Sequence, residues 1–77
     1  MGRFTTIEEL GRGIVDANKI KVTTIDNKEH IGWLYGCTPA VDNPSNQASV
    51  DVLYSEKRPE YGGWFFEENI IKTIEVL

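Results

Sequence analysis

The feature that most constrains this chain is a change in the spacing of its apolar residues at Lys19. Before that point Ile7, Leu10 and Ile14 recur at helical spacing, so that one stripe can face a core. From Lys19 onward, apolar and polar residues alternate, which is the period of a strand with one buried face. The chain has 77 residues, close to the lower size limit for an unaided hydrophobic core. The pattern therefore predicts a single domain, 1–77, that begins with a helix and continues as a sheet.

The predicted helix spans residues 6–18. Thr6 and Glu9 fit a capping box, in which a hydroxyl and a carboxylate satisfy backbone N–H groups that the start of a helix leaves free. Two glycines inside the segment weaken the helix by about 1 kcal/mol each relative to alanine, so it needs a surface to lie against. Asn18 is predicted to end the helix in the left-handed conformation.

Five short strands are predicted after the helix, at residues 20–25, 30–36, 48–55, 64–66 and 70–77. The first two flank the sequence DNKE, which is typical of a hairpin because Asp26 and Asn27 tolerate the positive φ that such turns require. Short strands with exposed edges usually curl into a small barrel. We therefore expect an α+β fold that is mostly β. A short N-terminal helix is followed by a five-stranded, strongly bent antiparallel sheet or small barrel over residues 20–77.

The second predicted strand carries an unusual pair of faces. Alternation places Ile31, Trp33 and Tyr35 on one side of it. The other side carries His30, Gly32, Leu34 and Gly36. Two glycines on one face predict either a strong bend or a place where another backbone comes close.

Three adjacent rings lie in the stretch EYGGWFFEEN, residues 60–69. Alternation puts Trp64 and Phe66 on one face of a strand and Phe65 on the other. The aliphatic residues assigned to the core are Ile7, Leu10, Ile14, Ile20, Val22, Ile31 or Leu34, Val50, Val52, Ile70, Ile74 and Val76. These residues fill most of a small core, so one aromatic cluster is predicted to be buried and the surplus rings to form a contact surface.

The composition excludes several classes of function. Hydrophobic residues make up 40% and charged residues 26%, as in a folded soluble domain, and the net charge is −4. The excess of acids lies after Ile25, and such a surface repels phosphate, which disfavours non-specific binding to nucleic acid. Cys37 is the only cysteine, so an intramolecular disulfide is excluded. Without a signal-like or membrane-spanning apolar run, we expect a cytoplasmic protein with no membrane contact.

The sequence offers few candidate residues for catalysis or for metal binding. His30, the only histidine, precedes Cys37 in one predicted strand by about 20 Å, at roughly 3.3 Å per residue, which is too far for a nucleophile and its base. These two residues cannot complete a structural zinc site, and no glycine-rich phosphate loop is present. General acid–base catalysis by two carboxylates that the fold brings together stays an open alternative. We predict no enzyme, no catalytic residue, no metal site and no cofactor, and interpret His30 as a solvent-facing hairpin residue.

The segments IKVTTIDNKEHIGWLYG, VDVLY and FFEENIIKTIEVL resemble the small SH3-like and Sm-like barrels. In these barrels a bent second strand carries a glycine and a short turn leads to the closing strand. A weaker likeness is to the YolD-like proteins of Gram-positive bacteria, in which a similar glycine-bearing strand precedes an I..I ending. The resemblance covers Ile20 to Val76 and implies a barrel fold.

Two departures limit what the resemblance implies. Sm proteins bind RNA with an Asp in the loop after strand two and an Arg-Gly near strand four. Here Asp42 comes late in an unusually long loop, and YGGWFF has no Arg before its glycines. No RNA-binding residue is therefore transferred. SH3 domains bind peptides in an aromatic groove, which Trp33, Tyr35, Tyr61 and Trp64 would supply.

The leading hypothesis is a non-enzymatic, acidic protein-binding domain that regulates or inhibits a basic partner protein. Tyr and Trp supply binding hot spots, and a rim of acids steers the encounter with a positive surface. The residues predicted for the contact are Arg58, Tyr61 and Trp64, a rim of Glu56, Glu60, Glu67 and Glu68, and in addition Trp33 and Tyr35. Acidic proteins of this size include phage-encoded inhibitors of defence enzymes, an analogy that rests on charge and size.

Three alternatives stay open. One is a single-stranded nucleic-acid binder of the Sm-like or OB-like type, whose rings stack on bases but which needs a basic groove. Another is a self-assembling barrel, because strands pair readily across subunits in a homo-oligomer. A third is an assembly that sequesters a small ligand in a pocket between the long loops.

Overall fold

The computed structural model describes residues 3–13 and 18–77. Within these ranges one short α-helix accompanies six strands, which form one antiparallel sheet in the order β1-β6-β2-β3-β4-β5. The elements are β1 (Arg3–Thr5), α1 (Ile7–Gly11), β2 (Lys19–Thr24), β3 (Glu29–Thr38), β4 (Ser49–Leu53), β5 (Gly63–Glu67) and β6 (Ile71–Val76). Short 3-10 helices, η1 (Ala40–Asp42) and η2 (Pro59–Tyr61), interrupt the two long loops.

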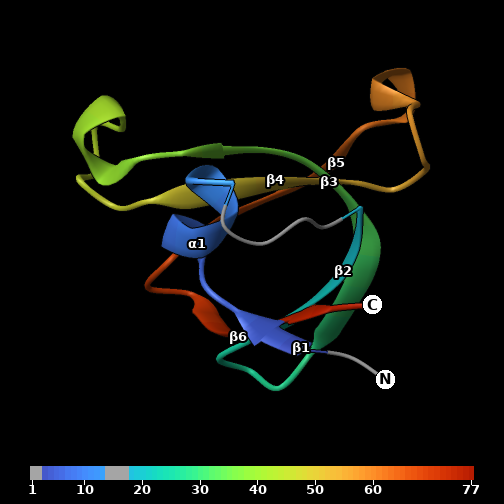
Figure 1. Cartoon of the computed structure of the whole chain (residues 1–77), viewed down its shortest axis with the longest axis horizontal. Coiled ribbons are helices and arrows are strands. Elements are labelled where there is room, and N and C mark those ends of the chain that lie inside the picture. Colours follow the sequence, from blue (N-terminus) through green and yellow to red (C-terminus); the bar gives the residue numbers. More distant parts are fainter. Residues whose placement is uncertain (1–2, 14–17) are drawn as a thin grey trace.

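The sheet is folded back on itself but is not closed. Figure 1 shows β1, β6 and β2 lying across from β4 and β5, with the long strand β3 curving from one layer to the other. The two edges of the sheet are β1 and β5. Helix α1 lies on one side of the space between the layers (Figure 1). The mostly β fold with one short helix is thus as predicted, with six strands in place of five.

The strand missed by sequence reasoning is β1. Its three residues pair with β6, so that Thr5 lies opposite Ile74 and is buried. A segment of three residues is too short to show an alternating pattern, and its partner lies at the other end of the chain. Only the pairing between the two ends of the sequence makes it a strand.

Helix α1 begins as predicted. Its N-cap is Thr6, whose hydroxyl accepts a hydrogen bond from the Glu9 backbone N–H at 3.1 Å. This is the first half of the predicted capping box. The Glu9 carboxylate does not complete it in the expected way, because it accepts a hydrogen bond from the Thr5 hydroxyl at 3.3 Å.

The predicted end of the helix at Asn18 is wrong. The helix ends at Gly11, and Gly13 takes the positive φ of +72° that was expected of Asn18. Glycine adopts this conformation at no steric cost, so it terminates a helix more readily than asparagine does. The predicted core position Ile14 lies outside the described residues.

The turn between β2 and β3 has the predicted hairpin geometry. Asn27 has a φ of +65°, and its N–H donates to the Thr24 carbonyl at 2.8 Å. The Asp26 carboxylate accepts hydrogen bonds from the Thr24 hydroxyl and, at 3.3 Å, from the Lys28 N–H. These bonds, chiefly that from Thr24, hold the pKa of Asp26 below its usual value.

Strand β3 contains a β-bulge at Tyr35. Leu34 pairs with Val52 and Gly36 pairs with Asp51, so Tyr35 is an extra residue without a partner on β4. A bulge shifts the alternation by one residue. Gly36 therefore does not share the inward face of Gly32, and the prediction that both glycines lie on one face is wrong. Gly32 does meet another backbone, because a Cβ atom there would collide with the carbonyl oxygen of Leu53.

The core lies between the layers of the sheet and is covered by α1. Its buried residues are Ile7, Leu10, Ile20, Val22, Val50, Val52, Phe66 and Ile74. Leu34, not Ile31, is the β3 residue that packs against it, and Val76 lies partly buried at its border. The prediction of Ile70 as a core residue is wrong, because it lies in the turn before β6 and is exposed.

The interpretation of His30 as a solvent-facing residue is also wrong. The His30 ring is half-buried and lies 5.2 Å from the Trp64 ring and 5.0 Å from the Phe66 ring, measured between centroids. The inward face of β3 thus begins with an imidazole that packs on β5. Of the helical segments that the structure describes, none has the length and apolar character needed to cross a membrane.

Candidate functional site

The three rings of the WFF stretch divide between the two faces of β5. Phe66 is 7% exposed and belongs to the core. Trp64 is half-buried against the same core, with its ring 4.6 Å from that of Tyr54 in a T-shaped arrangement. Phe65 points the other way and is 57% exposed. The predicted alternation is confirmed: Trp64 and Phe66 form part of the core wall, and Phe65 lies on the outer face of the sheet.

The outer face of β3, β4 and β5 carries a group of apolar side chains. Strand register aligns Trp33 with Leu53, and Asp51 with Phe65. Leu53 is buried although it lies outside the core cluster. Tyr35, at the bulge, is exposed, as is Ile31 two residues before Trp33. We call this group the outer apolar face; its members are Ile31, Trp33, Tyr35, Leu53 and Phe65.

A hollow of about 310 Å³ lies within the outer apolar face. Tyr35, Leu53 and Phe65 contribute to its lining, together with the carboxylate-bearing Asp51. Gly63 also lines the hollow. A Cβ atom there would collide with the Val52 carbonyl oxygen and lie 3.0 Å from the Leu53 Cα, so a glycine is required where β5 approaches β4 this closely.

Charged residues lie along the β2 side of this face. The Lys19 ammonium lies 5.5 Å from the centre of the Trp33 ring, a cation–π arrangement. The Lys21 ammonium pairs with Glu75 at 3.1 Å and with Glu29 at 3.5 Å. The hydrogen bond to Glu75 and the charges of both acids raise the pKa of Lys21 above its ordinary value. Both lysines thus interact with side chains of this protein. The charged side chain that lines the hollow is the carboxylate of Asp51.

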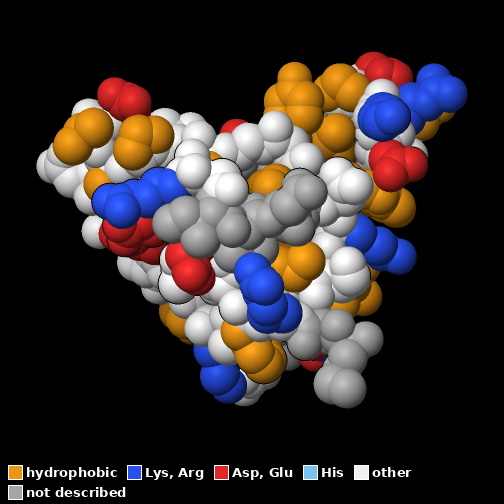
Figure 2. Space-filling view, viewed as in Figure 1, with side chains coloured by type: hydrophobic (Ala, Val, Ile, Leu, Met, Phe, Trp, Pro, Cys, Tyr) orange, Lys and Arg blue, Asp and Glu red, His pale blue; other side chains and the backbone are white. Residues whose placement is uncertain are grey.

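The predicted contact residues of the β4–β5 loop lie on a projection of the molecule. Glu56, Arg58, Glu60 and Tyr61 are exposed, and the Arg58 guanidinium lies 3.9 Å from the Glu60 carboxylate. Figure 2 shows both signs of charge gathered on this projection at the upper right. Pro59 of the same loop lines the hollow, so the projection borders the outer apolar face.

The structure does not bring all predicted contact residues together. Trp33 and Tyr35 belong to the outer apolar face, whereas the Trp64 ring packs inward against the core, although Trp64 also contributes to the lining of the hollow. Glu67, at the end of β5, accepts a hydrogen bond from the Ser45 hydroxyl. Glu68 lines a cavity beside α1.

The predicted contact residues did not include Ile31, Leu53 and Phe65 of this face, nor Asp51, which lines the hollow. The alternation of β4 and β5 already separates Leu53 and Phe65 from the inward-facing Val52 and Phe66, and this was the available signal. Alternation also places Tyr35 on the side of Trp33; the bulge, which turns Gly36 to the outer face, had no comparable signal.

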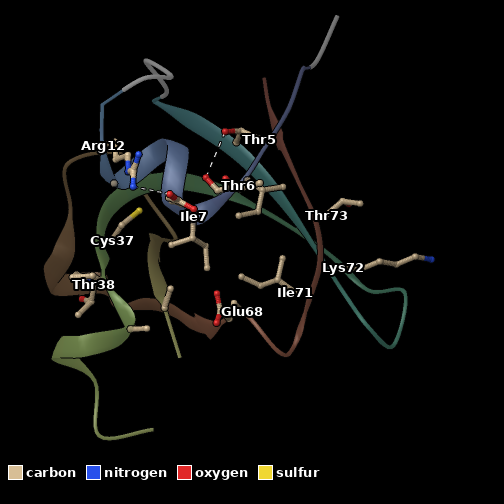
Figure 3. A pocket seen from close by; sticks show the side chains of 16 residues that line it. Thr5, Thr6, Ile7, Arg12, Cys37, Thr38, Glu68, Ile71, Lys72 and Thr73 are labelled. Atoms are coloured by element: carbon tan, nitrogen blue, oxygen red, sulfur yellow. Dashed lines mark hydrogen bonds and ion pairs between the residues drawn. The ribbon is translucent and has the colours of Figure 1, made fainter. Parts of the chain in front are cut away.

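The cavity beside α1 has a volume of about 730 Å³, within the range of small-molecule sites. Figure 3 shows it between α1, the end of β3 and the start of β6, with Ile7, Ile71 and Glu68 pointing toward its centre. At its rim the Arg12 guanidinium pairs with the Glu8 carboxylate at 2.9 Å. Three segments far apart in the sequence form this cavity, so no local pattern predicts it.

Cys37 lines the cavity and packs against the core. Burial raises the pKa of its thiol above the ordinary value, and the negative charge of Asp51 adds to the rise. The thiolate is the reactive form of cysteine.

We therefore expect iodoacetamide to alkylate Cys37 more slowly than free cysteine at neutral pH, with the pH–rate profile displaced toward higher pH. Alkylation in denaturant is the control and restores the ordinary profile; equal profiles in the folded and denatured states would contradict the effect of burial.

The described residues place no group of three or more His, Cys, Asp or Glu side chains where it would hold a metal ion. His30 packs on Trp64, whereas Cys37 lies at the cavity beside α1.

Comparison with known proteins finds no matching family model, no matching curated protein and no matching solved structure. The outer apolar face with its hollow is therefore judged as a site on its geometry alone.

Proposed function

We propose that this chain is a non-enzymatic protein-binding domain that recognises a basic partner protein through the outer apolar face. One observation carries the proposal: Ile31, Tyr35 and Phe65 are 48%, 63% and 57% exposed and lie on one side of the sheet, above the buried Leu53. Large apolar side chains gathered on one face, with aromatic rings among them, are typical of an interaction site.

The chemistry of the hollow favours a basic side chain as the central contact. Tyr35 and Phe65 line it with rings, and Asp51 contributes a carboxylate. A guanidinium is attracted to ring faces and forms charge-assisted hydrogen bonds with a carboxylate. The net charge of −4 draws a positive partner toward the molecule before contact. An arginine of the partner thus occupies the hollow while its neighbours contact Ile31 and Trp33.

The proposed role is that of a small regulator or inhibitor, in which occupation of a partner's basic surface is itself the effect. We also propose that the sheet is a variant of the SH3-like or Sm-like barrel. The last strand, β6, pairs back with β2, the first strand after the helix, which is the pairing that curls such a sheet. In this variant β1 extends the sheet beyond β6.

The test is a titration of the ¹⁵N-labelled chain with a short arginine-rich peptide, followed by NMR. We expect shifts of the backbone amides of Tyr35, Asp51, Leu53 and Phe65. Tyr35→Ala or Asp51→Asn should weaken binding by about fivefold, the effect of losing roughly 1 kcal/mol of interaction. Phe4→Ala is the matched control, because Phe4 is an exposed ring on β1, at the other edge of the sheet.

Two results would contradict this proposal. Shifts spread over the acidic loops, with no effect of Tyr35→Ala, would show attraction by net charge alone. Stronger binding to an oligo-thymidine single strand than to the peptide, lost on Tyr35→Ala, would instead favour the nucleic-acid alternative, in which the rings stack on bases.

A further inference from the structure

The edge strand β5 lacks the features that usually prevent an edge from pairing with another chain. It is an end strand of the sheet and pairs with β4 in continuous register, without a bulge. Its sequence, GWFFE, holds neither proline nor lysine. Natural sheets protect their edges with such residues, with bulges or with very short strands. The opposite edge, β1, is only three residues long, so among the strands that the structure describes β5 is the longer edge and the one more open to pairing.

The backbone groups that β5 offers at this edge follow from its bonds to β4. The Tyr54 N–H donates to the Gly62 carbonyl at 3.2 Å, and the Glu68 N–H donates to the Ala48 carbonyl at 2.8 Å. In an antiparallel pair, residues whose backbone groups bond to the neighbouring strand alternate with residues whose backbone groups face away from it. Both bonds above involve even-numbered residues, so the even-numbered residues of β5 bond to β4. The N–H and C=O groups of Gly63 and Phe65, and the N–H of Glu67, therefore point away from the sheet.

We propose that β5 pairs with β5 of a second copy of this chain, antiparallel and with the two-fold axis at Phe65. This register places each Phe65 opposite the partner's Phe65 on the outer face. On the inner face Trp64 lies opposite the partner's Phe66. On the outer face, on either side of the axis, Gly63 lies opposite the partner's Glu67. Aromatic residues directly across two strands stabilise the pair, and no like charges face each other.

The distribution of charge around β5 favours the antiparallel direction. Glu67 and Glu68 follow the last ring of the strand, whereas the segment before it holds Glu56, Lys57, Arg58 and Glu60, whose charges balance. Antiparallel pairing places the acids of each copy beside this balanced segment of the other copy. A parallel arrangement would set acids against acids. Because the pairing is isologous, it closes after two chains and uses both β5 edges, so that the three-residue β1 strands are the only edges of the described sheet left in the dimer.

This inference does not rest on the proposed function, because the main chain of β5 and the Phe65 ring can pair whether or not a partner occupies the hollow. It has a consequence for that function, since two outer apolar faces become neighbours across the axis and form one surface. A dimer then presents two hollows to one partner, and the second contact is made at high effective concentration.

The first test is sedimentation equilibrium over a micromolar to millimolar concentration series, with the wild type and Phe65→Pro. Proline removes the outward N–H of residue 65 but no hydrogen bond to β4, so the sheet is retained while the edge is blocked. We expect a dimer in the wild type and a dissociation constant raised by about tenfold or more in Phe65→Pro, the scale of one lost pair of edge hydrogen bonds. Circular dichroism verifies the fold, and Tyr35→Ala and Asp51→Asn, which act on the hollow, should leave the dimer unchanged.

The second test fixes the register and does not depend on how proline is tolerated. In a Cys37→Ser background, Phe65→Cys is compared with Glu67→Cys under mild oxidation. Opposed Cα atoms at the axis lie about 5.5 Å apart, which a disulfide spans. The two copies of residue 67 are separated by roughly 13 Å along the strand, so they should not cross-link. A wild type that is monomeric throughout, a dimer that persists in a folded Phe65→Pro variant, or equal cross-linking at both positions would overturn the proposal.

Discussion

Replacement of Gly32 by alanine is expected to lower the free energy of unfolding by about 3 kcal/mol, the upper range for overpacking a core. A Cβ atom at this position would collide with the Leu53 carbonyl oxygen and lie 2.7 Å from the Val52 Cγ1. Neither group moves freely, because Leu53 pairs with Trp33 and with Gly63 in the centre of the sheet. Relief of the clash requires separation of β3 from β4, and with it the loss of ladder hydrogen bonds.

Gly36→Ala is the matched control for this prediction. It lies on the same strand, four residues later, and a Cβ atom there meets nothing within 4 Å. We expect an unchanged or slightly higher stability, by up to about 1 kcal/mol, because alanine reduces the conformational freedom of the unfolded chain. Urea unfolding followed by tryptophan fluorescence measures both variants. Equal stabilities of the two variants would contradict the close approach of the strands at Gly32.

The second large effect is expected for Ile20→Ala, which should cost about 4 kcal/mol because it removes a fully buried side chain and leaves a cavity. Ile20 is 0% exposed and lies on β2 between Gly32 of β3 and Val76 of β6. The layer between the two halves of the sheet is thin, so few side chains can move to fill the space. A domain of this length has a total stability of about 4 to 12 kcal/mol, so the variant is expected to be partly or largely unfolded.

Ile31→Ala provides the comparison, since it removes the same atoms from the neighbouring strand but from its outer face. Ile31 is 48% exposed, and its removal should change stability by less than about 1 kcal/mol. Both variants are measured by urea unfolding in the presence of a stabilising osmolyte, which raises the stability of Ile20→Ala enough for its unfolding transition to be observed. A larger loss for Ile31→Ala than for Ile20→Ala would reverse the assignment of the two faces.

Local patterns predicted much of the strand content. The alternation of β2, the turn at Asn27 and the division of the WFF rings all depend on neighbours in the sequence, and all three are confirmed. One error was local: α1 ends at Gly11, earlier than its apolar stripe indicates, and Gly13 adopts a positive φ. Other errors arose where distant segments decide the outcome, as in the pairing of β1 with β6.

The candidate site was predictable only in part. Alternation placed Trp33 and Tyr35 on one side of their strand, and both lie on the outer apolar face. Trp64 was chosen as a contact because Tyr and Trp supply binding hot spots, yet its ring packs with His30 against the core. Composition shows that rings are in surplus, but it does not decide which of them the core takes.

By itself the sequence determined the alternation of β2 and β5, the hairpin turn and the absence of an internal disulfide, because these depend on nearest neighbours or on a count of residues. The tertiary structure alone decided that residues 3–5 join the sheet, that Tyr35 stands out as a bulge and that Trp64 belongs to the core wall. These features require pairing between segments far apart in the chain, and a shift of one residue in such a pairing exchanges the two faces of a strand. The bulge at Tyr35 is one such shift, because it turns Gly36 to the outer face and Cys37 toward the core.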